Sequence, residues 1–143
     1  MKSILVVVIA CLVCGFSGKK MAGDFRIENP RVMVPVAGTK TTAGYLDIVN
    51  PTKKDITIKV KSVEGFEFIE LHETYEEDGM MSMRMLDELV VKAESKSSLK
   101  PGGLHLMFMK AKKEFKEKDK LKVVLTKDGV DLEIELPFMN RKM

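Results

Sequence analysis

The sequence predicts an all-β domain built as an antiparallel sandwich or barrel. Three observations support this fold class: hydrophobic residues recur with a period of two, turn signals separate the segments, and no amphipathic helix is convincing. The alternation is clearest at 121–125 and 130–136, which Lys127-Asp128-Gly129 joins as a hairpin. Short strands at this spacing are typical of sandwiches and barrels.

The remaining strands follow from the same signals. Segments 25–36 and 43–50 precede the turn Asn50-Pro51, and 55–63 carries alternating Ile56, Ile58 and Val60. Segments 66–74 and 80–86 flank Asp78-Gly79, and 88–92 is apolar. Segments 97–100 and 104–109 are separated by Pro101-Gly102-Gly103, and 120–127 and 130–136 form the hairpin described above. Lysines fill 110–120, but acids interrupt them, so we expect a solvated loop.

Composition excludes several classes of protein. The chain has 143 residues, with 24 basic and 21 acidic side chains, and its net charge of +3 is too small to indicate a nucleic-acid-binding protein. Its hydrophobic content of 45% is too high for a disordered chain, and two cysteines exclude a disulfide scaffold. The sequence therefore predicts one domain over 23–143, which we expect to be monomeric.

Residues 1–22 are predicted to be a signal peptide. Lys2 precedes an apolar run over 3–16, which is shorter than the roughly 20 residues of a membrane-spanning helix. A permanent anchor helix is the alternative. Both cysteines, Cys11 and Cys14, lie here, and Val8-Ile9-Ala10-Cys11 resembles a lipobox in which Cys11 becomes lipidated. Otherwise both are ordinary apolar residues of the signal. We expect an exported protein of the bacterial periplasm or cell envelope, without thiols in the mature domain.

The two histidines and the methionines form one pattern. Six of the 11 methionines lie between positions 80 and 109, close to His72 and His105. Because residues two apart on a strand share a face, His105, Met107 and Met109 should lie on one face. Met81, Met83 and Met85 should share a face by the same rule.

Two registers are open for the strands that flank Asp78-Gly79. A four-residue loop over 76–79 places His72 directly opposite Met83. A two-residue turn at Asp78-Gly79 places His72 opposite Met85, with Met83 diagonal. Either register leaves an imidazole and a thioether within reach of one metal ion.

Thioethers and imidazoles suit Cu(I), since a site without anionic ligands favours a soft monovalent ion. Methionine is also a common filler of protein cores, so a methionine stripe by itself is weak evidence for metal binding. A metal-free module that binds a protein partner through its methionines is therefore an alternative. A blue-copper electron carrier is excluded, because it needs a Cys ligand that the mature chain lacks.

The pattern resembles the copper motif of the PCu(A)C family of bacterial copper chaperones. His72 is followed after ten residues by Met83, and after 21 more by His105-Leu106-Met107. The flanking words Ala43-Gly44-Tyr45-Leu46, Leu71-His72-Glu73-Thr74 and Pro101-Gly102-Gly103-Leu104 are also similar, and the resemblance covers about 27–137. An aromatic residue that the family often carries near Val32 or Met33 is absent.

The resemblance implies a cupredoxin-like Greek-key β-sandwich with an exposed Cu(I) site. It implies His72, Met83, His105 and Met107 as ligands and delivery of copper to an acceptor such as the dinuclear copper centre of cytochrome c oxidase. Met81 and Met109 lie outside the motif, as extra ligands or packing residues, and Met85 is expected to be core or surface filler. The predicted function is not enzymatic. Copper sequestration for tolerance is an alternative to delivery.

Overall fold

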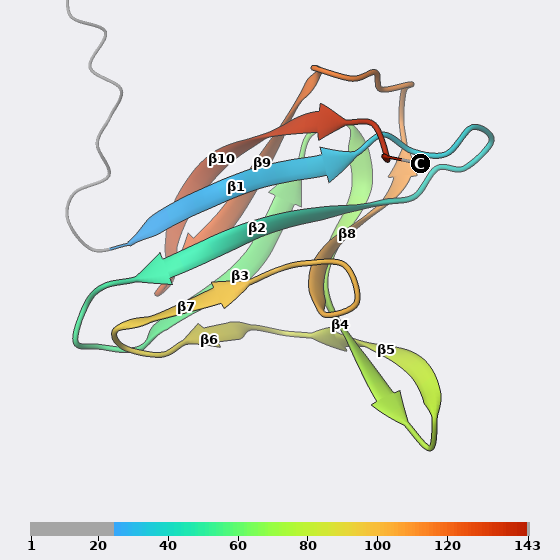
Figure 1. The fold of residues 1–143 in the computed structure, drawn as a ribbon. Coiled ribbons are helices and arrows are strands. Elements are labelled where there is room, and N and C mark those ends of the chain that lie inside the picture. The colour runs from blue at the N-terminus through green and yellow to red at the C-terminus, as the bar shows by residue number, and fades with distance from the viewer. Residues whose placement is uncertain (1–24, 143) are drawn as a thin grey trace, which may run out of the picture.

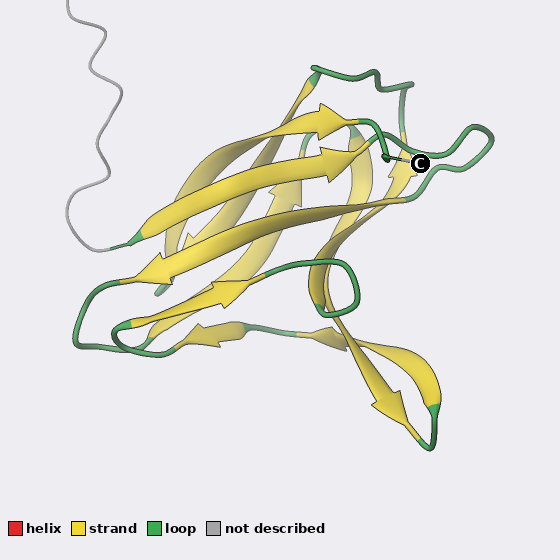
Figure 2. Ribbon diagram, in the orientation of Figure 1, coloured by secondary structure: helices red, strands yellow, loops and turns green. Residues whose placement is uncertain are grey.

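The computed structural model describes residues 25–142, and within this range the chain consists of strands and loops without a helix (Figure 2). No segment of the described chain is therefore a helix that could cross a membrane. The predicted signal peptide with Cys11 and Cys14 lies outside the described residues. Ten strands form where ten were predicted, with ends that differ by a few residues. They are β1 (Arg26–Met33), β2 (Thr42–Asn50), β3 (Ile56–Val63), β4 (Phe66–Glu77), β5 (Met80–Leu86), β6 (Leu89–Val91), β7 (Ser95–Ser98), β8 (Leu104–Ala111), β9 (Lys120–Lys127) and β10 (Val130–Met139).

The strands form a sandwich of two layers (Figure 1). One layer has the order β5-β4-β8-β2-β1, with β7 also paired to β2, and the other has the order β10-β9-β3-β6. Strand β10 joins the layers, because it pairs with β9 along its length and with β1 at its end. The predicted antiparallel sandwich is confirmed, with one exception: β1 and β10 are parallel, at Val32 opposite Phe138. The first and last strands of the sandwich run side by side in the same direction.

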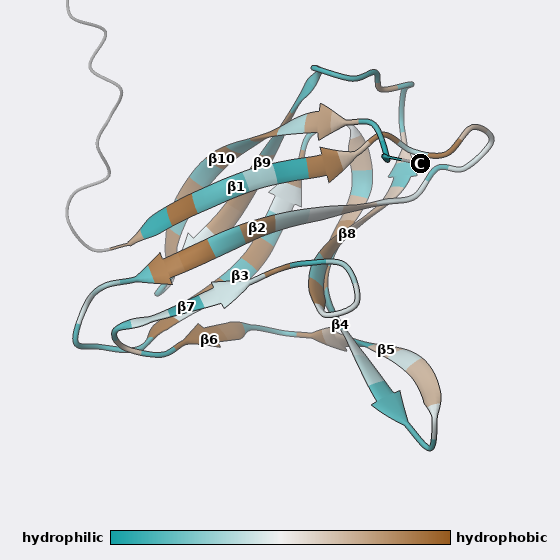
Figure 3. Cartoon of the chain, viewed as in Figure 1, coloured by the Kyte–Doolittle hydropathy of each residue, from teal (hydrophilic) through white to brown (hydrophobic). Residues whose placement is uncertain are grey.

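The core lies between the two layers. Alternation delivers one face of a strand to it, most regularly in β2, where buried and half-buried residues alternate along the whole strand. Figure 3 shows bands of apolar and polar residues along strands of both layers. Phe66, Phe115 and Phe138 stack in series, with ring centroids 4.9 and 4.5 Å apart. Phe115 comes from the lysine-rich loop after β8, so this segment is a loop as predicted, but it also inserts one buried ring into the core.

Gly44 allows β2 and β8 to approach closely. A Cβ atom at this position would lie 2.7 Å from the ring of Phe108, which is fully buried. Gly44 is paired with Leu106 on β8. The close approach of the two strands supports β8, which carries His105.

Asn50 ties three segments together at the end of β2. It is fully buried, and its side-chain amide donates to the carbonyl oxygens of Lys54, Val91 and Lys92 at 2.8–3.0 Å. Its side-chain oxygen accepts from the backbone N–H and the hydroxyl of Thr52. A buried side chain with this many partners is costly to replace.

We expect Asn50→Leu to lower the free energy of unfolding by roughly 3 kcal/mol, because it removes the donor to three backbone carbonyl groups, of which that of Val91 is buried. Asn140→Ala is the matched control, since Asn140 is exposed and makes one bond to Glu117, and it should cost no more than about 0.5 kcal/mol. Urea denaturation measures both variants. Equal stability of the two variants would contradict a structural role for Asn50.

Candidate metal centre

The β4–β5 hairpin turns at Asp78-Gly79. Both residues have positive φ, 50° and 76°, as a two-residue type I′ turn requires, and Glu77 pairs directly with Met80. This selects the two-residue register, and the four-residue loop over 76–79 is wrong. His72 therefore lies opposite Met85, and Met83 lies opposite Thr74.

Strand β4 pairs with β8 along its other edge. His72 lies opposite His105, and Glu70 lies opposite Met107. Met85, His72 and His105 thus form one row across three adjacent strands, which we call the histidine row. Met83 and Met107 flank this row on opposite sides, each two residues from it along its strand. Two strands distant in the sequence, β4 and β8, bring the two histidines together.

The imidazole rings of His72 and His105 lie edge to face. Their centroids are 5.7 Å apart and their planes meet at 62°. His105 is 6% exposed, and the side chain of His72 is 17% exposed. Leu106 and Phe108 fill the core from the other face of β8, so the histidines lie on its outer face.

One nitrogen of each imidazole ring makes a hydrogen bond that orients the ring. Nδ1 of His105 lies 3.0 Å from the carbonyl oxygen of Gly103, to which only an N–H can donate, so Nε2 is left with a lone pair. Nε2 of His72 lies 2.7 Å from a carboxylate oxygen of Glu70, which leaves Nδ1 with the lone pair. A ring N–H bonded to a carboxylate or backbone carbonyl is the usual arrangement behind a metal-binding histidine.

Nδ1 of His72 is buried and has no hydrogen-bond partner. Such a group is rare in proteins, because burial of an unpaired polar atom costs roughly 1–3 kcal/mol. Within residues 25–142, no group of three or more His, Cys, Asp or Glu side chains is arranged so that it could hold a metal ion. A metal at the free nitrogens would therefore depend on thioether ligands, which fits a soft ion rather than a hard one.

The methionines of β5 are surface residues. Met81, Met83 and Met85 are 62%, 58% and 59% exposed, so the core-filling interpretation does not apply to them. Their strand is an edge of the sheet, and the hairpin projects from the sandwich (Figure 1). Met107 is half-buried.

Met81 and Met109, the candidate extra ligands, lie away from the histidine row. Met81 is opposite Glu76 and Met109 is opposite Phe68, each four residues from His72 along β4. Four residues of strand correspond to about 13 Å. The structure brings His72, His105, Met85, Met83 and Met107 into one neighbourhood, and these two methionines lie at its ends.

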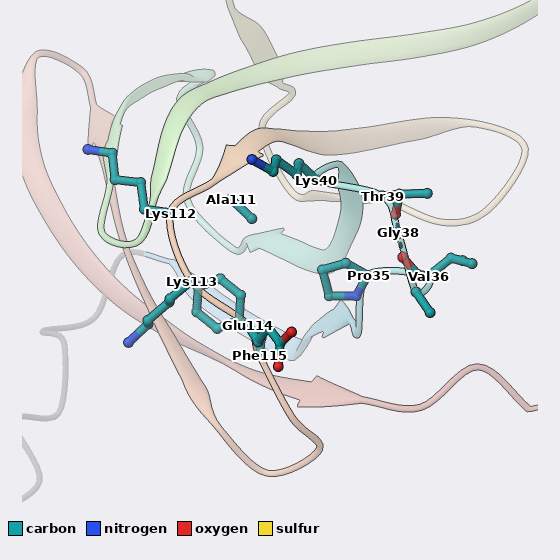
Figure 4. Close-up of a pocket in the computed structure, with 11 residues that line it drawn as sticks. Pro35, Val36, Gly38, Thr39, Lys40, Ala111, Lys112, Lys113, Glu114 and Phe115 are labelled. Atoms are coloured by element: carbon teal, nitrogen blue, oxygen red, sulfur yellow. Dashed lines mark hydrogen bonds between the residues drawn. The ribbon is translucent and has the colours of Figure 1, made fainter.

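A separate open cavity of about 560 Å³ lies between the loop after β1 and the loop after β8 (Figure 4). Lys40, Lys113 and Phe115 are among its lining residues. It adjoins Ala111, at the opposite end of β8 from His105, roughly 20 Å away along the strand. This cavity is therefore not part of the histidine site.

The model of the LpqE-like family, whose description reads "Putative lipoprotein LpqE-like", matches residues 25–138. This chain belongs to the LpqE-like family. No curated protein matches the sequence. Solved structures of PCuAC domains share the fold of this LpqE-like chain, which confirms the predicted cupredoxin-like sandwich and the resemblance to the PCu(A)C family at the level of fold.

Three of these structures illustrate the similarity. The apo PCuAC domain from PmoF1 is 19% identical, with a TM-score of 0.67 over 83% of this chain and 96% of that one. The copper-bound PCuAC domain from PmoF2 is 19% identical, with a TM-score of 0.65 over 83% and 95%. The CuI-DR1885 solution structure from Deinococcus radiodurans is 21% identical, with a TM-score of 0.67 over 85% and 82%.

The hydrogen bonds predict opposite tautomers for the two neutral histidines. We expect His72 to carry its proton on Nε2 and His105 to carry its proton on Nδ1, as nitrogen NMR of the imidazoles would show. Glu70→Ala should release the preference of His72, because it removes the carboxylate that accepts its N–H. Glu73→Ala is the control, since Glu73 bonds Arg84 instead. A His72 tautomer that is the same in wild type and Glu70→Ala would contradict this role of Glu70.

Proposed function

We propose that this protein is an exported, non-enzymatic copper metallochaperone that binds one Cu(I) ion through His72, Met83, His105 and Met107. The observation that carries the proposal is the buried, unpaired Nδ1 of His72, beside His105 and exposed thioethers. Two of the solved structures with the same fold are of copper forms, the copper-bound PCuAC domain from PmoF2 and CuI-DR1885.

The donor set explains the choice of ion. Thioether and neutral imidazole ligands leave the charge of the ion uncompensated, which disfavours hard divalent cations and suits Cu(I). Neither cysteine lies within residues 25–142, so no thiolate of the described domain competes for the ion. Without thiolates, the site also avoids loss by disulfide formation in an oxidising compartment.

The placement of the ligands suits transfer to an acceptor. His105 is buried and His72 is half-buried, and both are oriented by Gly103 and Glu70, whereas the β5 thioethers are exposed on an edge strand. An acceptor could therefore displace the thioethers first, while the imidazoles still hold the ion. We propose delivery to a copper protein such as the dinuclear centre of cytochrome c oxidase.

Sequestration of copper for tolerance would use the same ligands. A transfer assay distinguishes the two functions: a chaperone passes Cu(I) to an apo acceptor domain faster than free diffusion of released copper allows. A sequestering protein would transfer copper only at its spontaneous rate of dissociation.

We expect His72→Ala and Met107→Ala each to weaken Cu(I) binding by at least about tenfold, since even the loss of an outer partner of a metal ligand costs 10–100-fold. Competition with a Cu(I) chelator measures the affinity. Met139→Leu is the control, because Met139 is an exposed methionine at the end of β10. Unchanged affinity in both ligand variants would refute the proposed site.

We also propose export of the protein with lipid attached at Cys11, which the lipoprotein description of the family supports. Cys11→Ser should then move the protein from the membrane fraction to the soluble fraction of the cell envelope. Cys14→Ser, three residues away, should leave the protein in the membrane fraction. Identical fractionation of the two variants would argue instead for an ordinary cleaved signal or a permanent anchor helix.

A further inference from the structure

The motif methionine Met83 is not the thioether that lies nearest the two histidines in the sheet. Met85 is in the histidine row, directly opposite His72, whereas Met83 is level with Thr74. Directly opposed side chains have Cβ atoms about 5 Å apart, and diagonal ones about 7–8 Å. At the level of the Cβ atoms, Met85 is thus the nearer of the two to His72.

The position of Met107 also favours Met85 over Met83 as its partner on one ion. It is level with Glu70, on the opposite side of the row from Met83. Positions level with Thr74 and Glu70 are four residues apart along β4, about 13 Å, and β5 and β8 are two strand spacings apart, about 10 Å. On a flat sheet Met83 and Met107 would be roughly 16 Å apart at the backbone, against about 12 Å for Met85 and Met107. The twist of the sheet at its edge and the flexible thioether side chains must close this larger gap when Met83 binds.

Both β5 thioethers are free to move. Met83 and Met85 are 58% and 59% exposed, and a methionine side chain has three rotatable bonds. The backbone between them is anchored: Arg84 binds Glu73 at 2.6 and 2.8 Å and lies over the ring of Tyr75. An exchange between the two sulfurs would therefore need side-chain rotation and no slip of the strand.

We propose that Met83 and Met85 share one ligand position and exchange on a single Cu(I) ion; this rests on the proposed function above. With Met85 bound, the ion lies in the histidine row beside Met107. With Met83 bound, it moves toward the tip of the hairpin. One copper–sulfur bond breaks as the other forms, and the ion remains Cu(I), so the step needs neither an oxidant nor a proton.

The exchange gives transfer a direction. The tip of the hairpin projects from the sandwich (Figure 1), and β5 is the edge strand of its layer. Movement of the ion from Met85 to Met83 brings it toward solvent, where the ligands of an acceptor can approach. In this proposal Met85 is a copper ligand, and not the core or surface filler that the sequence predicted.

Met83→Leu, Met85→Leu and the double variant test this proposal, because Met-to-Leu changes conserve volume and these side chains are exposed. Met80→Leu is the control, because Met80 is also an exposed methionine of β5 but lies opposite Glu77 at the turn. X-ray absorption counts the sulfur ligands of bound Cu(I), and chelator competition gives the affinity.

We expect two sulfur ligands in the wild type and in each single variant, with affinity lowered by only about two- to threefold, since one of two alternative arrangements remains. The double variant should retain one sulfur and lose at least about tenfold in affinity. Loss of a sulfur in either single variant, or no loss in the double variant, overturns the sharing. A wild-type protein that binds no Cu(I) instead overturns the proposed function itself.

Discussion

The backbone hydrogen bonds of β4 to two neighbours at once are the constraint on which the site depends. Pairing with β5 places Met85 beside His72, and pairing with β8 places His105 on its other side. A slip of one residue in either ladder would turn the partner side chains to the opposite face of the sheet. The type I′ turn at Asp78-Gly79, the Arg84–Glu73 ion pair and the close packing of Gly44 against Phe108 all oppose such a slip.

Orientation of the imidazoles adds a second level of order to the histidine row. Gly103 and Glu70 each accept a hydrogen bond from one ring N–H, so that the other nitrogen of each neutral ring keeps its lone pair. The folded protein therefore carries an unpaired buried nitrogen on His72, which opposes stability until a ligand binds. An ion at the proposed site would need little rearrangement of these side chains, because the rings are already oriented.

The two faces of β4 and β8 have different functions. Leu71, Leu106 and Phe108 bury the inner face in the core, and the outer face of the same strands presents imidazoles and thioethers. An exposed edge strand with four methionines is a risk for strand-to-strand association. Strong projection of the hairpin and the charges of Glu76 and Glu77 near its tip reduce that risk. The same exposure makes the sulfur atoms accessible to a partner.

The sequence by itself determined the class of the fold, the ten strands and the small set of residues suited to copper. Period-two alternation and Gly-containing turns are local signals, so they can be interpreted without knowledge of tertiary contacts. Which residues become neighbours across strands depends instead on long-range pairing. The tertiary structure therefore decided between the two hairpin registers and made β1 and β10 parallel. It drew Phe115 into the core and left Met81 and Met109 at the ends of the site. It also paired Glu70 with His72. These residues are two apart on one strand, but whether they form a hydrogen bond depends on the orientation of the imidazole ring, which the sequence does not give.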